Sequence, residues 1–170
     1  MLKPKLEKAL NDQLNYEVYS AYIYWSMSAH LETMALPGFA NWMRIQAQEE
    51  MVHATKFYQF IIERNGKVIL DTIAKPENEW PGVLAIFEDA LKHEQSVTSR
   101  INDLVDLSIT EKDHASNAFL QWFVSEQVEE ESTAEDVIQQ LKLTEEAKGA
   151  LFLLDKEMAT RVFTPPTQGE

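Results

Sequence analysis

The stretch FANWMRIQAQEEMVHATKFYQF, residues 39–60, decides which fold this chain is expected to adopt. One face of the stretch repeats at steps of three and four residues, which is the period of an amphipathic helix. That face begins and ends with aromatic residues but carries Glu50 and His53 in its middle. A core-facing stripe that is interrupted by a carboxylate and an imidazole predicts a helical bundle with a polar centre.

Three other segments show the same interrupted stripe. Each has apolar residues at helical spacing and one inward-facing carboxylate near its middle, and these carboxylates are Glu17, Glu94 and Glu130. The chain has only six prolines and five glycines, which leaves long stretches between the turn signals. The sequence therefore predicts an all-α four-helix bundle.

The 170 residues are expected to form one domain. Thr110 and Thr144 are the expected N-caps of the fourth helix and of a short fifth helix. The expected helices cover about residues 6–34, 38–64, 83–109, 111–143 and 145–160, with a crossover over 66–82 and a loose tail over 161–170.

The connection over residues 66–82 predicts the topology. Fully extended, it reaches at most ~55 Å, whereas the second helix should be ~40 Å long. The connection can therefore return along the whole bundle, so the second and third helices are expected to run parallel. The other long helices are joined by short turns and should form two antiparallel hairpins, with one long crossover between them.

Composition excludes several classes of function. Acidic residues outnumber basic ones by 28 to 15, and a net charge of −13 disfavours nucleic-acid binding and attracts cations. Cysteine is absent, which rules out a disulfide scaffold, a thiolate metal centre and a thiol nucleophile. The sequence shows neither a signal peptide nor about 18 consecutive apolar residues. A cytoplasmic protein with no membrane partner is the expectation.

The inward carboxylates point to a metal site. Burial of an unpaired carboxylate is costly, and four at one level also repel one another. No lysine or arginine lies on the stripes at that level to neutralise Glu17, Glu50, Glu94 and Glu130. Two divalent cations would do so, and oxygen ligands with one imidazole suit iron, manganese or zinc.

The spacing of these residues indicates two related hairpins. Glu17 and Glu50 are 33 residues apart, as are Glu94 and Gln127. The second helix of each hairpin offers a pair three residues apart, namely Glu50 with His53 and Gln127 with Glu130. A single such pair arises often by chance, but four matched positions in two hairpins favour one shared site.

This arrangement resembles the ferritins over almost the whole chain. The segments that carry the resemblance are Asn11–Asn15, Ala47–His53 and Phe119–Gln127, and they are similar to non-haem bacterial and archaeal ferritins. Those proteins have a ferritin-like bundle with one long crossover and a short fifth helix. The second hairpin has glutamine at position 127 where bacterioferritins and rubrerythrins keep a second Glu-x-x-His pattern.

The resemblance implies the ligands of two iron ions. Glu17, Glu50 and His53 would hold the first iron, with Glu50 bridging. Glu94 and Glu130 would hold the second iron more loosely, with the neutral Gln127 close by. It also implies a third iron site, formed by Glu49, Glu126 and Glu129.

Three further residues or groups of residues have two interpretations each. Tyr24, two turns after Glu17, is a candidate electron donor or ligand-orienting residue, or a core tyrosine. Met51 stands where bacterioferritins ligate haem, but the second hairpin argues against haem. Glu111, Asp113 and His114 could line an ion pore in a shell or serve as ordinary helix-start residues.

The function implied is iron storage and detoxification. The chain would act as a ferroxidase that oxidises Fe(II) with O2 or peroxide and deposits ferric mineral inside a homo-oligomeric cage of 24 subunits. Three alternatives stay open. They are a di-metal oxidase acting on an organic substrate, a non-enzymatic bundle with a polar core, and a DNA-protecting mini-ferritin whose iron site lies between subunits.

Overall fold

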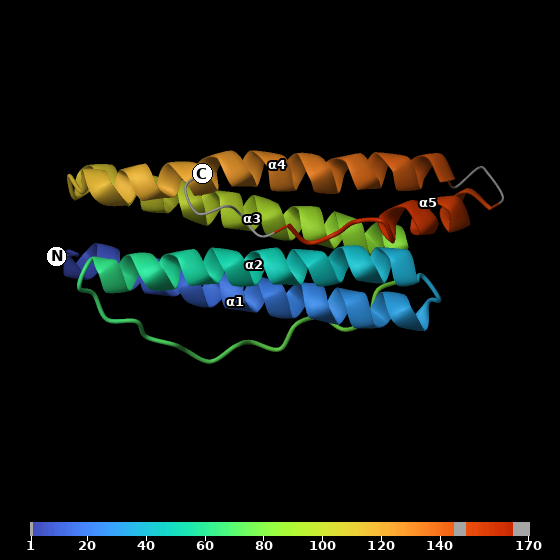
Figure 1. Ribbon diagram of the computed structural model, residues 1–170, viewed down its shortest axis with the longest axis horizontal. Helices are drawn as coiled ribbons and strands as arrows, with labels where there is room; N and C mark the ends of the chain where they lie inside the picture. Colours follow the sequence, from blue (N-terminus) through green and yellow to red (C-terminus); the bar gives the residue numbers. More distant parts are fainter. Residues whose placement is uncertain (1, 145–148, 165–170) are drawn as a thin grey trace.

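Five helices make up the structure, a computed structural model that describes residues 2–144 and 149–164. They are α1 (Pro4–Thr33), α2 (Pro37–Glu63), α3 (Val83–Thr110), α4 (His114–Thr144) and α5 (Ala150–Met158). Within those two ranges there is no strand. The four long helices lie side by side and α5 crosses one end of the bundle (Figure 1). The prediction of an all-α four-helix bundle is confirmed.

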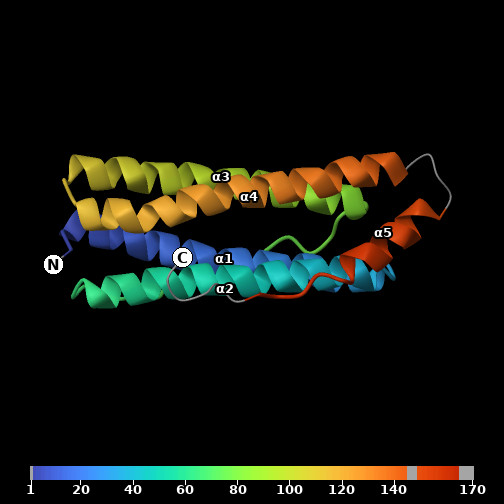
Figure 2. The same cartoon turned by 45° about the horizontal axis from the view of Figure 1, so that its top comes forward.

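Two hairpins and a long crossover give the topology. A residue in the left-handed region makes each short turn, Ala35 (φ 58°) between α1 and α2 and Lys112 (φ 54°) between α3 and α4. The crossover returns along the outside of α1, so that α2 and α3 run in the same direction (Figures 1 and 2).

Two asparagines of α1 hold the first half of the crossover. The side chain of Asn11 accepts a hydrogen bond from the backbone N–H of Ile69 (2.7 Å) and donates one to the carbonyl of Lys67 (2.9 Å). One turn later, Asn15 bonds in the same way to the N–H of Asp71 and the carbonyl of Ile69, both at 2.8 Å. The amides thus satisfy backbone groups that no strand pairs.

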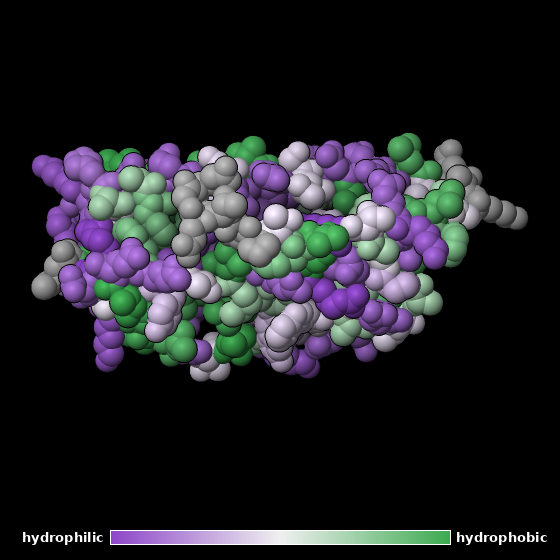
Figure 3. All heavy atoms as spheres, in the orientation of Figure 1, coloured by the Kyte–Doolittle hydropathy of each residue, from purple (hydrophilic) through white to green (hydrophobic). Residues whose placement is uncertain are grey.

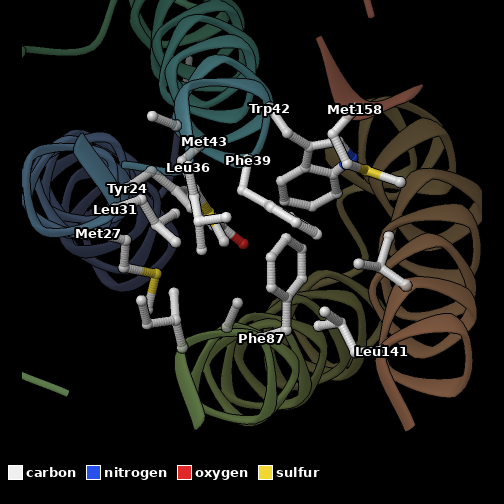
Figure 4. Packing of buried hydrophobic residues seen from close by; sticks show 14 of the residues in the cluster. Tyr24, Met27, Leu31, Leu36, Phe39, Trp42, Met43, Phe87, Leu141 and Met158 are labelled. Atoms are coloured by element: carbon white, nitrogen blue, oxygen red, sulfur yellow. The ribbon is translucent and has the colours of Figure 1, made fainter. Parts of the chain in front are cut away.

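Buried apolar residues form two clusters along the bundle. One contains Phe39, Trp42 and Phe87 and extends to α5 (Figure 4), and the other contains Phe57 and Phe123. The inward carboxylates lie between them along the helices, so apolar layers close the polar centre from both ends.

The turn between α3 and α4 corrects one expectation. Thr110 is the last residue of α3, not the N-cap of the next helix, and α4 begins at His114. The cap is Asp113, whose Oδ1 accepts a hydrogen bond from the N–H of Ser116 (3.0 Å). Its carboxylate also pairs with both terminal nitrogens of Arg64, at 3.1 and 2.9 Å. These contacts give Asp113 a structural role at the helix start.

Replacing Asp113 by alanine is expected to lower the free energy of unfolding by about 1–3 kcal/mol. The Arg64 guanidinium lowers the pKa of Asp113 from an ordinary 3.8 to about 2. A lowered folded-state pKa adds stability above pH 3.8 that is lost as pH falls through about 2. The gap between wild type and Asp113→Ala in urea unfolding should shrink over that range. Asp106→Ala, an exposed change on α3, should cost less than about 0.5 kcal/mol.

The fifth helix also differs from its expected range. Thr144 ends α4, and α5 begins at Ala150 after Gly149, which has a φ of 85° that favours glycine. The helix ends at Met158, so residues 159–160 lie beyond it. The expected first residues of that helix, 145–148, and the tail over 165–170 lie outside the described residues.

Asp155 docks α5 on the start of α2. Its Oδ1 accepts hydrogen bonds from the backbone N–H groups of Gly38 (2.8 Å) and Phe39 (3.0 Å), so a side chain of α5 caps α2. The helices approach so closely that a Cβ on Gly38 would lie 1.7 Å from the backbone oxygen of Asp155. Only glycine fits at position 38.

Gly38→Ala is therefore expected to force α5 away from α2 and to lower the free energy of unfolding by about 1–3 kcal/mol. Gly82→Ala is a matched control, because a Cβ there meets no atom of the described residues within 4 Å. Thermal unfolding of both variants tests this docking. Equal midpoints for the two variants would show that the contact does not matter for stability.

None of the helices that the structure describes is long and apolar enough to cross a membrane.

Candidate metal centre

All four long helices contribute polar side chains to one level of the bundle. Glu17 comes from α1, Glu50 and His53 from α2, Glu94 from α3, and Gln127 and Glu130 from α4. Each of these six side chains is buried. The placement follows from the sequence, because each residue lies on the stripe that its helix turns toward the core.

Two groups of these side chains are close enough to hold a metal ion. Glu17, Glu50 and His53 each offer a ligand atom, and these atoms lie within 4.8 Å of one another. His53, Glu126 and Glu130 form a second such group. The His53 ring joins the groups, with Nδ1 3.5 Å from Glu50 Oε2 and Nε2 3.9 Å from Glu126 Oε1.

Three polar residues outside the ligand groups hold the carboxylates in place, two of them directly and one through another residue. Gln13 donates a hydrogen bond from Nε2 to Glu17 Oε1 (2.9 Å), and Arg100 donates from Nε to Gln13 Oε1 (2.9 Å). On the other side, Gln46 donates from Nε2 to Glu130 Oε2 (2.7 Å). Such outer contacts fix the rotamers of metal-binding side chains.

Glu94 is held by two neighbours and lies in neither ligand group. The hydroxyl of Tyr24 donates a hydrogen bond to Glu94 Oε1, and Gln127 donates from Nε2 to Glu94 Oε2 (3.1 Å). Gln127 therefore presents its amide nitrogen to the carboxylate. The charge of Glu94 still acts on Glu50, which places the two side chains in one electrostatic cluster.

The metal-free centre disfavours negative charge. Burial and then the Glu50 charge raise the pKa of Glu17 to about 8, and burial and the Glu94 charge raise the pKa of Glu50 to about 7. Burial and the Glu130 charge raise the pKa of Glu94 to about 8. Burial also raises the pKa of Glu130. A cation would reverse each of these penalties.

The pKa values of His53 and Tyr24 are shifted by the same carboxylates. Burial alone lowers the pKa of His53, but the carboxylates, Glu50 above all, more than offset it and raise that pKa well above its usual range. Burial and then the Glu94 charge raise the pKa of Tyr24 well above its usual range, so the hydroxyl keeps its proton. A metal ion would need His53 in its neutral form.

Two buried carboxylate oxygens also indicate that a cation binds here. Glu17 Oε2 and Glu50 Oε2 are buried and accept no hydrogen bond from any residue that the structure describes. A buried acceptor without a partner costs about 1–3 kcal/mol. Both oxygens belong to the first ligand group, where a metal ion would satisfy them.

The three residues expected at a third iron site have different surroundings. Glu126 belongs to the second ligand group, whereas Glu49 and Glu129 belong to neither group. Glu129 is exposed, and Glu49 pairs with Arg161 at 2.7 Å. Arg161 was expected in a loose tail, so this contact was not anticipated.

Sequence reasoning also missed the orienting residues. Gln13 and Gln46 lie on the inward stripes of α1 and α2. A buried glutamine one turn before a buried glutamate was the available signal for Gln13, whereas Gln46 bonds to Glu130 of α4 and not to Glu50. The contribution of Arg100 had no such signal, since it depends on how α3 packs against α1.

A four-helix bundle with carboxylates from every helix and a histidine three residues after one of them defines the carboxylate-bridged metal proteins. The ferritin-like domain family matches residues 7–144, and the chain belongs to the ferritin family.

Its relatives include bacterial non-haem ferritins and archaeal ferritins. A bacterial non-haem ferritin from Staphylococcus epidermidis is 42% identical over 163 residues, which cover 96% of this chain and 98% of the relative. An open-pore ferritin from Archaeoglobus fulgidus is 48% identical with a TM-score of 0.94, covering 95% of this chain and 100% of that one. A humanized archaeal ferritin is 49% identical with a TM-score of 0.95, covering 97% and 100%.

Proposed function

We propose that this ferritin stores iron, and that each subunit oxidises Fe(II) at the buried cluster before ferric mineral forms. The observation that carries the proposal is the set of buried carboxylates around His53 with two unpartnered oxygens, Glu17 Oε2 and Glu50 Oε2. Such a set favours cations and favours Fe(III) over Fe(II), because the higher charge gains more from the same ligands. Family membership identifies iron as the cation.

We propose that the chain binds two Fe(II) ions per subunit as substrate. Glu17, Glu50 and His53 bind the first, and Glu50 bridges toward the second. Glu94 and Glu130 bind the second, with Gln127 beside it. Gln127 places a neutral amide beside this position where a carboxylate would add a charged ligand, so the second position holds its iron less tightly and releases the product more readily. One tighter and one looser iron position suit a site through which iron passes on its way to storage.

The other residues of the cluster release protons or hold the ligands in position. Burial favours the protonated forms of Glu17 and Glu94 in the metal-free protein, so iron binding is expected to release protons from them. Tyr24 keeps Glu94 in place through its hydroxyl and stands where it can supply an electron to the oxidant. The oxidant is O2 or peroxide. Glu49, Glu126 and Glu129 are proposed to hold a third iron on its way out.

A container is required for mineral, and we propose a homo-oligomeric cage of 24 subunits. The surface supports association, because apolar side chains of α1 and the crossover are exposed: Tyr22, Trp25, Ile69, Leu70 and Ile73. Apolar patches lie among hydrophilic residues along the edge that the crossover occupies (Figure 3). Patches of this kind mark interfaces between proteins.

Aerobic addition of Fe(II) to metal-free protein tests the proposal. Fast oxidation at about two irons per subunit, followed by a soluble iron-rich particle of several hundred kilodaltons on a sizing column, is the expected result. Fast oxidation without a large particle would favour a di-iron oxidase acting on another substrate. Oxidation no faster than in buffer alone would contradict the proposal.

A further inference from the structure

Arg161 lies against a carboxylate at the edge of the metal centre. Its Nη2 is 2.7 Å from Glu49 Oε2, and the two side chains are 24% and 25% exposed, so solvent screens the pair only in part. The guanidinium also lies over the Trp42 ring, 4.5 Å from its centroid. Its Nη1 is buried and has no hydrogen-bond partner within residues 2–144 and 149–164.

The packing of α5 and of the segment after it against α2 positions Arg161 next to Glu49. Asp155 docks α5 on the first residues of α2, and the chain after α5 turns back along α2 toward the middle of the bundle (Figure 2). Asn41 anchors that segment by donating from Nδ2 to the carbonyl of Arg161 (3.1 Å). Trp42, which receives the guanidinium, packs next to Met158 of α5 (Figure 4). Both the backbone and the side chain of Arg161 are therefore held.

We propose that Arg161 is a tethered cation that competes with iron for Glu49 and so weakens the third iron position. This inference rests on the proposed function, in which Glu49, Glu126 and Glu129 hold the third iron. Arg161 neutralises Glu49 when no metal is present, and an iron ion that binds Glu49 must displace the guanidinium. Arg161 thus determines the affinity of the third position by occupying one of its ligands.

The charges around the pair support competition and not simple anchoring. Burial raises the pKa of Glu130 of the second ligand group, and the positive charge of Arg161 is one of the influences that oppose that rise. Burial raises the pKa of the Glu49 carboxyl, the charges of Arg161 and His53 oppose that rise, and the charge of Glu126 adds to it. Arg161 therefore replaces part of the positive charge that a third iron would bring. A tethered cation makes binding there reversible, which a position of transit requires.

Anaerobic titration of the metal-free, assembled protein with Fe(II), followed by calorimetry, tests this inference. Wild type should show two tight binding steps and one weaker step per subunit. Arg161→Gln should tighten the third step by about tenfold, because an amide cannot neutralise Glu49, and leave the first two steps unchanged. Arg161→Lys keeps a tethered charge and should keep the third step weak. Arg44→Gln, which removes an arginine paired with Glu32 elsewhere on α2, is the matched control.

The outcomes separate this inference from the proposed function. Absence of the two tight steps in wild type would contradict the function itself. If those two steps are present but the third step in Arg161→Gln matches wild type, or is missing from both, Arg161 does not control iron binding. Equal tightening in Arg161→Lys and Arg161→Gln would also overturn the inference, because the charge would not be the cause.

Discussion

Replacing Glu50 and His53 together by alanine is expected to slow Fe(II) oxidation by more than about a hundredfold. Even residues that only orient metal ligands typically change affinity or activity by 10–100-fold, and Glu50 and His53 are proposed to touch the iron itself. The change removes the imidazole of the first ligand group and the carboxylate that is proposed to bridge the two irons. Stopped-flow absorbance of the ferric product, measured at two irons per subunit, gives the rate.

Two controls make this result specific to the cluster. Glu63→Ala removes an exposed carboxylate from the end of α2 and should oxidise iron at the wild-type rate. A sizing column should show that the double variant still assembles, since the exposed residues of α1 and the crossover are unchanged. A wild-type rate in an assembled double variant would mean that oxidation takes place elsewhere on the protein, and the proposed ligands would be wrong.

The main features of the fold could be predicted because helical periodicity is a local property. Every long helix has an apolar stripe, and a crossover of known length allows only a few arrangements. Helix ends were harder to predict, because caps depend on single side chains. Thr110 looked like a cap, but Asp113 has a carboxylate that reaches Ser116 and binds Arg64, the residue that follows the end of α2. That second partner is distant in the sequence and gave no signal.

The candidate site could also be predicted only in part from the sequence. The inward carboxylates could be identified because each interrupts an apolar stripe, and the structure brings them to one level. The second layer of contacts could not be identified, since Gln13 binds Arg100 of α3 only once the helices are packed. Arg161 is the clearest case. Nothing in the sequence near it indicates a metal centre, and it reaches Glu49 only because α5 docks on α2.

Glu17→Gln is expected to stabilise the metal-free protein, although it removes a residue of the site. The pKa of Glu17 is about 8 in the folded state against an ordinary 4.5. As pH rises from 4.5 to about 8, the unfolded chain loses this proton and the folded chain keeps it, so the free energy of unfolding falls. Glutamine cannot ionise and avoids this loss. The variant should therefore be more stable by about 2–3 kcal/mol at pH 8 and should match wild type more closely at pH 5.

When metal is bound, wild type should be more stable than Glu17→Gln. This reversal distinguishes a metal site from a core that is merely strained by a buried carboxyl. Thermal unfolding at pH 8 is measured first with a chelator and then with Zn(II), which does not oxidise. Zinc should raise the midpoint of wild type, because a ligand that binds only the folded state stabilises it, and should raise that of Glu17→Gln much less. Glu63→Gln, an exposed change, should follow wild type in both conditions. If zinc stabilises Glu17→Gln as much as wild type, Glu17 is not a ligand, and its buried carboxyl serves the packing of the bundle.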